Sequence, residues 1–195
     1  SVMNPLSAIV DLDTDLFLLI NGAHAPWADA VMGLASDMRI WFPAYALFLV
    51  LLKKRYAWKG LFLALPVIAL MIVASDTGSV LLFKETVHRL RPCHEPALQG
   101  SVHLVNGYCG GQYGFVSSHA SNHFAIAAFM AWALQGRPLW AGGALFGWAA
   151  FIGFSRIYLG VHYPGDVLVG GLYGIVVGSL FFAIFRRVLA LRAKA

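Results

Sequence analysis

Long apolar stretches dominate the chain and are separated by short polar segments. Four of them are long enough to cross a bilayer as helices: about residues 59–82, 120–136, 138–155 and 166–186. A fifth stretch, at about 38–52, is shorter but extends upstream through Trp41. The pattern predicts an all-α integral membrane protein, a helical bundle of about five to six transmembrane helices.

The N-terminal region, about residues 5–36, follows a different pattern. Its first apolar run carries Asp11, Asp13 and Asp15 and ends at the pair Asn21-Gly22, which is typical of a helix stop. Three acids are costly inside a membrane, so we expect an interfacial helix here rather than a span. The first residues lack a charged segment followed by an apolar core, so we expect no cleavable signal peptide.

Composition supports the membrane interpretation. Hydrophobic residues make up 59% of the 195 residues and charged residues only 12%, with a net charge of +5. Such a chain is too apolar for an ordinary soluble domain, and its length suits a single domain spanning residues 1–195. The absence of a basic stripe with interleaved aromatic residues argues against nucleic acid binding, and we expect membrane lipids rather than an obligatory protein partner around it.

The basic residues between the apolar stretches predict the orientation. Three groups of them fall on one side of the predicted bundle: Lys53, Lys54, Arg55 and Lys59; Arg137; and Arg186, Arg187, Arg192 and Lys194. The positive-inside rule puts that side, and the C-terminus, in the cytoplasm. All nine acids then fall on the outer half. We therefore expect a protein of the cell (inner) membrane whose opposite face meets the periplasm or exterior.

The outward loop at about 92–116 holds both cysteines, Cys93 and Cys109. An oxidising compartment and a short loop favour a disulfide between them, worth about 3 kcal/mol. Two free thiols are the simpler alternative. A Cys2His2 zinc site with His94 and His103 is conceivable, but the spacing matches no common zinc pattern.

The first polar segment with candidate chemistry is 84–92, at the outer end of a predicted span. On a continuous helix Lys84, His88 and Arg91 share one face, and Pro92 ends that helix. Two cations on one face repel each other unless an anion lies between them. The alternative is that Lys84 and Arg91 reach separately toward lipid headgroups.

The second segment, 114–123, lies directly before an apolar helix. Ser117 or Ser118 suits the N-cap of that helix, so free backbone N–H groups face outward together with His119 and form a ready anion site. His123 lies one turn further on and can share that face. The alternative is a capped helix with an incidental histidine.

The third segment is 155–166. Pro164 fits the first turn of the last helix, which leaves His162 just before the helix and Asp166 inside its first turn. A carboxylate in that place can accept a hydrogen bond from one imidazole nitrogen and leave the other as a nucleophile. The alternative is a helix cap with a surface histidine.

Together the three segments resemble the type 2 phosphatidic acid phosphatase (PAP2) family, in its membrane-bound bacterial lipid phosphatase branch. Segment 84–92 matches the family pattern K-x6-R-P, segment 116–119 is similar to P-S-G-H, and segment 155–166 matches S-R-x5-H-x3-D. The resemblance covers about residues 59–186 and implies the helical core that this family shares with haloperoxidases.

The second motif departs from the family pattern at two positions. Val116 replaces the proline and Ser118 replaces the glycine. The turn is therefore less constrained, and a hydroxymethyl group lies where the backbone would approach a phosphate closely. We expect the site to differ most from its relatives at this turn.

The resemblance implies a role for each matching residue. His162 would attack phosphorus, Asp166 would orient it, and His119 would protonate the leaving oxygen and later activate water. The phosphoryl oxygens would be held by side chains and backbone N–H groups of Lys84, Arg91, Ser117, Ser118 and Arg156. Three cations supply the positive charge, so the resemblance implies no metal and no cofactor.

Four further residues are weaker candidates: Asp76, His88, Arg89 and His123. Asp76 lies two turns deeper than Lys84, where it could anchor the basic site from behind or simply lie near water at the boundary. His88 could line the lipid-phosphate entrance or contact a headgroup.

An outward site at headgroup depth favours a lipid phosphate or diphosphate as substrate. A polyprenyl diphosphate such as undecaprenyl diphosphate is the first expectation, with phosphatidylglycerophosphate, phosphatidic acid and lipid A phosphates as alternatives. A lipid phosphotransferase would pass the phosphate to a second lipid instead of water. A haloperoxidase has a similar site in soluble relatives, and a transporter or scramblase would bind headgroups without chemistry.

Overall fold

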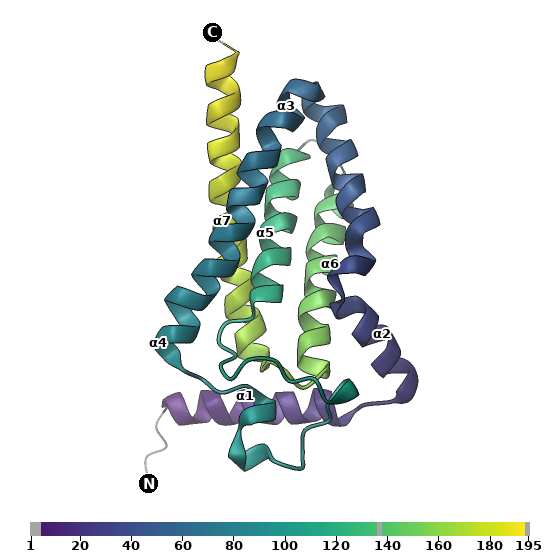
Figure 1. The fold of residues 1–195 in the computed structure, drawn as a ribbon, viewed down its shortest axis with the longest axis vertical. Helices are drawn as coiled ribbons and strands as arrows, with labels where there is room; N and C mark the ends of the chain where they lie inside the picture. Colours follow the sequence, from purple (N-terminus) through teal and green to yellow (C-terminus); the bar gives the residue numbers. More distant parts are fainter. Residues whose placement is uncertain (1–4, 136–137, 194–195) are drawn as a thin grey trace.

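Helices make up most of the computed structural model, which describes residues 5–135 and 138–193 (Figure 1). The long helices are α1 (Pro5–Gly22), α2 (Pro26–Ser36), α3 (Phe42–Ser79), α5 (Ser118–Ala133), α6 (Leu139–Tyr158) and α7 (Pro164–Arg192). Shorter turns are η1 (Met38–Trp41), η2 (Val80–Lys84), α4 (Glu85–Val87), η3 (Pro92–His94), η4 (Pro96–Leu98) and η5 (Val105–Gly107). Within the described residues the only β-type pairing is an isolated bridge between Leu90 and Tyr113, so the prediction of an all-α fold is confirmed.

Helix α3 is a hairpin with two arms. At Ala57 the backbone leaves the helical region, with a φ of 56°, and the chain reverses direction there (Figure 1). The two arms are the apolar stretches predicted at 38–52 and 59–82. Within residues 5–135 and 138–193, two helical segments are long and apolar enough to cross a membrane by length and composition: Met38–Val87 and Pro164–Arg192. The predicted end of the 120–136 stretch, Arg137 and Lys194 lie outside the described residues.

Helices α5 and α7 approach each other closely because α7 presents glycines to the α5 backbone. A Cβ added at Gly170, Gly174 or Gly178 would meet the carbonyl oxygens of Ser117, Ser121 and Ala125, respectively. These glycines are spaced four residues apart, so they form one smooth stripe along α7. The stripe brings the first turn of α5 against the first turns of α7, where the third motif ends.

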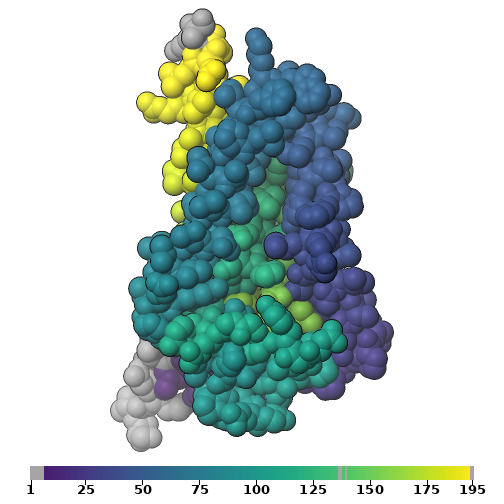
Figure 2. Space-filling model, in the orientation of Figure 1, coloured from purple at the N-terminus to yellow at the C-terminus, as the bar shows by residue number. Residues whose placement is uncertain are grey.

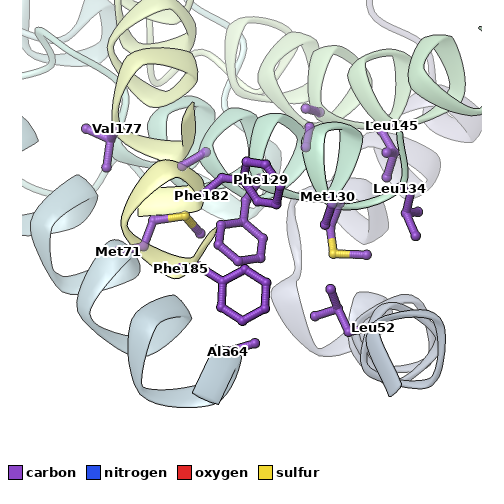
Figure 3. Close-up of a cluster of buried hydrophobic side chains, with 14 of the residues drawn as sticks. Leu52, Ala64, Met71, Phe129, Met130, Leu134, Leu145, Val177, Phe182 and Phe185 are labelled. Carbon is purple, nitrogen blue, oxygen red and sulfur yellow. The ribbon is translucent and has the colours of Figure 1, made fainter. Parts of the chain in front are cut away.

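One end of the bundle is closed by apolar side chains, and we call it the far end. It lies near the turn at Ala57. Phe129 of α5 packs edge-on against Phe182 of α7, with ring centroids 5.6 Å apart, and Phe185 lies beside both (Figure 3). Met71 and Leu52 from the two arms of α3 complete this cluster. Buried aromatic and aliphatic side chains of this size stabilise the packing of α3, α5 and α7.

The opposite end, which we call the capped end, is crossed by α1. This helix runs across the ends of the other helices instead of among them (Figure 1). Its Phe17 is buried against Tyr163, and its Asn21 side chain donates to the carbonyl oxygens of His103 and Tyr158 at 2.8 and 2.7 Å. Helix α1 ends at Gly22, as the Asn21-Gly22 pair predicts. It is therefore docked on the segments that precede α7.

The surface between the two arms of α3 is hollowed, and α5 is visible at its base (Figure 2). An apolar pocket of about 310 Å³ lies there, lined mainly by both arms of α3 and by α5. The loop that follows α4 covers the capped end beside this hollow (Figure 2). The fold thus brings an apolar groove next to the loop and helix starts that carry the three motifs.

Candidate active site

His162 lies in the short connection between α6 and α7, directly beside Asp166. Pro164 opens α7, so Asp166 falls in its first turn, as predicted. The Asp166 Oδ2 atom lies 3.3 Å from His162 Nδ1 and accepts the Tyr163 backbone N–H at 3.0 Å. Both side chains are buried, with 2% and 0% of their surfaces exposed. With Nδ1 turned to the carboxylate, Nε2 carries the lone pair available for attack.

The surroundings of His162 keep its imidazole neutral. Burial is the largest cause that holds its pKa well below the usual value, followed by the positive charges of Arg91, Arg156 and Lys84. An unprotonated imidazole is the form that can act as a nucleophile. The three predicted cations therefore all act on the same histidine.

Arg91 reaches this histidine from a loop, which corrects the prediction of one continuous helix. Helix α4 ends at Val87, His88 takes a left-handed conformation with a φ of 52°, and Arg91 is extended. The backbone N–H of Arg91 donates to the carbonyl oxygen of Gln112 at 3.0 Å, so the extended segment at Arg91 pairs with the loop before α5. The Arg91 Nη1 atom lies 3.3 Å from His162 Nε2. Lys84, His88 and Arg91 thus do not share one helix face, because the chain turns at His88 before Pro92 is reached.

Lys84 is held by the hydroxyl of Ser118. Its Nζ donates to Ser118 Oγ at 2.8 Å, and Ser118 Oγ lies 2.6 Å from Ser79 Oγ. Since Ser79 donates its own hydrogen to the carbonyl oxygen of Asp76 at 2.7 Å, the hydroxyl of Ser118 donates to Ser79. The serine that replaces the glycine of the family pattern is therefore a fixed partner of Lys84.

The start of α5 presents its backbone N–H groups to the same region. Ser117 is the N-cap, and its side chain accepts the N–H of Ala120 at 3.4 Å. Val116 and Ser117 are fully buried, and Ser117 lies against Gly170 of the α7 stripe, so the turn is fixed by packing even without the proline and glycine of the family pattern. His119 follows in the first turn of the helix, where the positive end of the dipole favours an anion.

Arg156 of α6 and His119 line one polar pocket of about 620 Å³ at the capped end. Arg156 is 7% exposed, and its Nη1 donates to the hydroxyl of Ser36 at the end of α2. Among the described residues, the Nε atoms of Arg91 and Arg156 are buried and have no hydrogen-bond partner. Buried guanidinium donors without a partner are costly, and an anion such as a phosphoryl group would satisfy them.

The weaker candidates separate into two kinds. Asp76 accepts a hydrogen bond from Asn122 at 3.2 Å and is exposed, and the exposed ring of His88 packs on Tyr113 with centroids 4.9 Å apart. His123, in contrast, is 2% exposed and is held at both nitrogens, by the carbonyl oxygen of His119 at 2.7 Å and by the Tyr45 hydroxyl at 3.0 Å. It therefore supports the backbone at His119.

Arg89 also belongs to the site, in a way that its sequence position does not reveal. Its guanidinium lies between the carboxylates of Asp166 and Asp13. Asp13 was one of three similar acids on an apolar helix, and Ser36 was an ordinary helix-end serine, so no pattern marked either as part of the site. Their place is set by the docking of α1 and α2 on the capped end.

Cys93 and Cys109 form a disulfide with a Cα–Cα distance of 6.0 Å. Both sulfur atoms are therefore bonded to each other, and His103 donates to Asp29 at 3.0 Å instead of approaching them. The Cys2His2 zinc site considered from the sequence is not formed. The disulfide closes the loop that carries Tyr108 at the rim of the polar pocket.

Comparisons with known proteins agree with the motifs. The family model described as PAP2 superfamily matches residues 60–189. A lipid A 4'-phosphatase of Bacteroides thetaiotaomicron is 37% identical over 181 residues, which cover 92% of this chain and 80% of that protein. A putative undecaprenyl-diphosphatase of Escherichia coli is 31% identical over 174 residues, with 87% and 80% covered.

Two solved structures share the fold. The crystal structure of LpxE from Aquifex aeolicus superposes with a TM-score of 0.62 at 30% identity and covers 88% of this chain and 95% of that one. A transmembrane PAP2-type phosphatidylglycerolphosphate phosphatase from Bacillus subtilis superposes with a TM-score of 0.68 at 20% identity, covering 96% and 90%. The second likeness concerns the fold alone.

Proposed function

The chain belongs to the PAP2 superfamily and is a membrane phosphatase, and from that premise we propose that it hydrolyses a lipid phosphate through a phosphohistidine formed on His162. The observation that carries this proposal is the neutral, buried His162, fixed by Asp166 and surrounded by three cations. A neutral imidazole beside concentrated positive charge is suited to attack a phosphoryl group.

In the first step, His162 Nε2 forms a bond to phosphorus as the bond from phosphorus to the lipid oxygen breaks. His119 gives its proton to that leaving oxygen. In the second step, His119 takes a proton from water, the water oxygen attacks phosphorus, and the bond from nitrogen to phosphorus breaks. Asp166 accepts the Nδ1–H of His162 throughout and stabilises the positive charge that develops on the ring.

The phosphoryl oxygens are held by the open donors of the site. Arg91 and Arg156 offer their unpartnered Nε atoms, and Lys84 offers the ammonium that Ser118 holds. The backbone N–H of Ser118 adds the positive end of α5, whereas that of Ser117 donates to the carbonyl oxygen of Asp166. This set of cations can balance the charge of a metaphosphate-like transition state, so no step of this mechanism passes through a metal ion.

A lipid substrate is favoured by the apolar pocket beside the site. It shares Met38 with the polar pocket and runs between the arms of α3, so a lipid chain there would leave its phosphate near His119. Among lipids, the greater identity to a lipid A 4'-phosphatase now puts a lipid A phosphate ahead of the polyprenyl diphosphate expected from the sequence.

For the membrane, we propose five crossings by the two arms of α3 and by α5, α6 and α7, with α1 on the outer surface. The basic residues of the far end would then face the cytoplasm, together with the C-terminus, and the capped end would face the periplasm across the inner membrane. All of these elements would then belong to one membrane domain, residues 1–195. Cysteine labelling at Ser101 and at Lys54, with impermeant reagent, tests this orientation.

The test of function is phosphate release from purified protein in detergent, with EDTA present, across lipid A, polyprenyl diphosphate, phosphatidic acid and phosphatidylglycerophosphate. We expect release from at least one lipid and its loss in His162→Ala, with unfolding temperature unchanged. Release that requires an added acceptor lipid would identify a phosphotransferase. Full activity of His162→Ala would disprove the assignment of the nucleophile, and inactivity of the unmodified protein on every lipid would favour transport.

A further inference from the structure

Arg89 is bound by two carboxylates from opposite ends of the chain. Its Nη1 lies 2.7 Å from Asp13 Oδ2 of α1 and 3.1 Å from Asp166 Oδ1 of α7. The three side chains are 23%, 13% and 0% exposed, respectively. Ion pairs in such a shielded place are stronger than surface pairs, and breaking one leaves a buried charge without its partner.

The two oxygens of Asp166 have separate duties. Oδ2 accepts the Tyr163 N–H and faces His162 Nδ1, whereas Oδ1 is bound by Arg89. The guanidinium also stacks on the Tyr163 ring, with its central carbon 3.9 Å from the ring centroid. Arg89 is therefore fixed both by charge and by packing, and it prevents the carboxylate from turning away from the histidine.

Asp13 fixes the same assembly from the side of α1. Its Oδ1 accepts the backbone N–H of Gly165 at 2.7 Å, in the first turn of α7. A Cβ at Gly165 would lie 2.8 Å from Asp13 Oδ2, so the close approach of α1 requires a glycine there. Asp13 thus holds Arg89 and the start of α7 in one arrangement.

We propose that Arg89 and Asp13 are positioning residues for the Asp166–His162 pair, which makes the docked helix α1 a part of the catalytic machinery. The proposal rests on the function proposed above. A guanidinium bound by two carboxylates has most of its charge compensated, which distinguishes it from Arg91 and Arg156, whose Nε atoms lack partners. Arg89 therefore acts on the reaction through Asp166 and not by holding phosphate.

The chain supplies matched controls for this test. Asp11 and Asp15 lie on the same helix as Asp13 and carry the same charge, but both are exposed. The variants Asp11→Asn and Asp15→Asn remove the same surface charge as Asp13→Asn without touching Arg89. The variant Arg89→Lys keeps the charge with a different shape, and Arg89→Gln removes the charge.

We would measure kcat and KM for phosphate release by these variants, beside the unmodified protein and His162→Ala. We expect Arg89→Gln to lose roughly 100-fold in kcat with KM within about 2-fold, because misplaced catalytic groups act on the chemical step. Arg89→Lys should recover part of that loss, and Asp13→Asn should lose roughly 10-fold. Asp11→Asn and Asp15→Asn should stay within about 2-fold of the unmodified protein. The double variant Asp13→Asn/Arg89→Gln should lose less than the product of the two single losses.

Two outcomes would overturn the proposal. A rise in KM with unchanged kcat for Arg89→Gln would make Arg89 a phosphate ligand. Equal losses for Asp11→Asn and Asp13→Asn would show a general charge effect of α1. If Arg89→Gln does not fold, Arg89→Lys and Asp13→Asn carry the same test with thermal unfolding as the check.

A failure of the proposed function is recognised separately, because the unmodified protein would then release no phosphate. In that case the ¹⁵N resonance of His162 Nδ1 reports whether Asp13→Asn weakens the bond to Asp166 while Asp11→Asn does not. An identical spectrum in both variants would reject the positioning role independently of catalysis.

Discussion

The capped end and the far end of the bundle are built from the same helices but from opposite kinds of contact. At the capped end, α7 begins with the buried Asp166 carboxylate, which Arg89 of the loop after α4 binds, and with the Gly165 N–H, which donates to Asp13 of α1. At the far end, α7 packs Phe182 and Phe185 against α5 (Figure 3). The groups of the charged site require hydrogen-bond and ion-pair partners from many segments. The apolar cluster requires only side chains of suitable volume and shape.

This difference separates stability from chemistry. Burial of apolar side chains at the far end stabilises the fold without the cost of desolvating polar groups. The polar network of the capped end contributes less net stability, since burying its charges costs about as much as pairing them returns. Substitutions at the capped end should therefore change activity, and also stability where they leave a buried charge unpaired, whereas those at the far end should change only the free energy of unfolding.

The largest expected effect is on the chemistry at His119. His119→Ala should lose roughly 100- to 10,000-fold in the rate of phosphate release from a lipid, because the leaving oxygen then departs without a proton. With p-nitrophenyl phosphate, whose leaving group needs no proton, the initial burst of p-nitrophenol should remain while steady turnover stays slow. Loss of the burst as well would contradict the role of His119 as the acid.

The counterpart at the far end is Phe129→Ala. Removing this buried ring should cost about 3–5 kcal/mol of unfolding free energy, while kcat per folded molecule stays unchanged. Phe151→Ala on α6, where the side chain is exposed, is the matched control and should change stability little. Denaturant unfolding in detergent measures both. A fall in kcat with unchanged stability would contradict the separation of the two ends.

The glycine stripe runs along α7 between the two ends, so a change in it should affect both stability and activity. Gly174→Leu should force α7 away from the Ser121 carbonyl and cost about 1–3 kcal/mol. It should also lower kcat, because the starts of α5 and α7 separate. Gly147→Leu on α6 has open space for the added side chain and should leave both quantities unchanged. Equal effects of the two substitutions would show that the stripe does not set the helix spacing.

A smaller effect is expected at Ser118. Ser118→Ala removes the acceptor of Lys84 and should raise KM by roughly 2- to 10-fold, the value of one such hydrogen bond. Ser179→Ala removes a comparable hydrogen bond, to Trp132 on the far half of the bundle, and should not change KM. An unchanged KM in Ser118→Ala would mean that Lys84 is positioned without the serine.

The smallest expected effect is that of pH on the nucleophile. Because burial and three cations lower the pKa of His162, its imidazole stays neutral as the pH falls through 6.5, the ordinary value. The p-nitrophenol burst, corrected for ionisation of the substrate, should therefore not decline in that interval. A decline centred near 6.5 would show an unshifted histidine.

The places of His162 and Asp166 at the start of α7 were predicted correctly from local rules alone. Because Pro164 opens α7, His162 falls just before the helix and Asp166 falls in its first turn. The first motif was not, because the left-handed turn at His88 depends on the pairing of Leu90 with Tyr113 across the loop. Helical spacing therefore grouped Lys84 and Arg91 on a shared helix face that does not exist, and the structure brings both to His162 by another route.

The apolar helices, the end of α1 at Gly22 and the three family motifs could all be read from the sequence, because hydrophobic period and turn chemistry act over a few neighbouring residues. Only the tertiary structure selected Asp13 from three equivalent acids and gave Ser118 its partner. Both choices depend on which surfaces of distant helices meet. The glycine stripe and the docking of α1 determine which helix surfaces pack together. The energy of that packing comes from contacts between residues far apart in the sequence, which no local pattern contains.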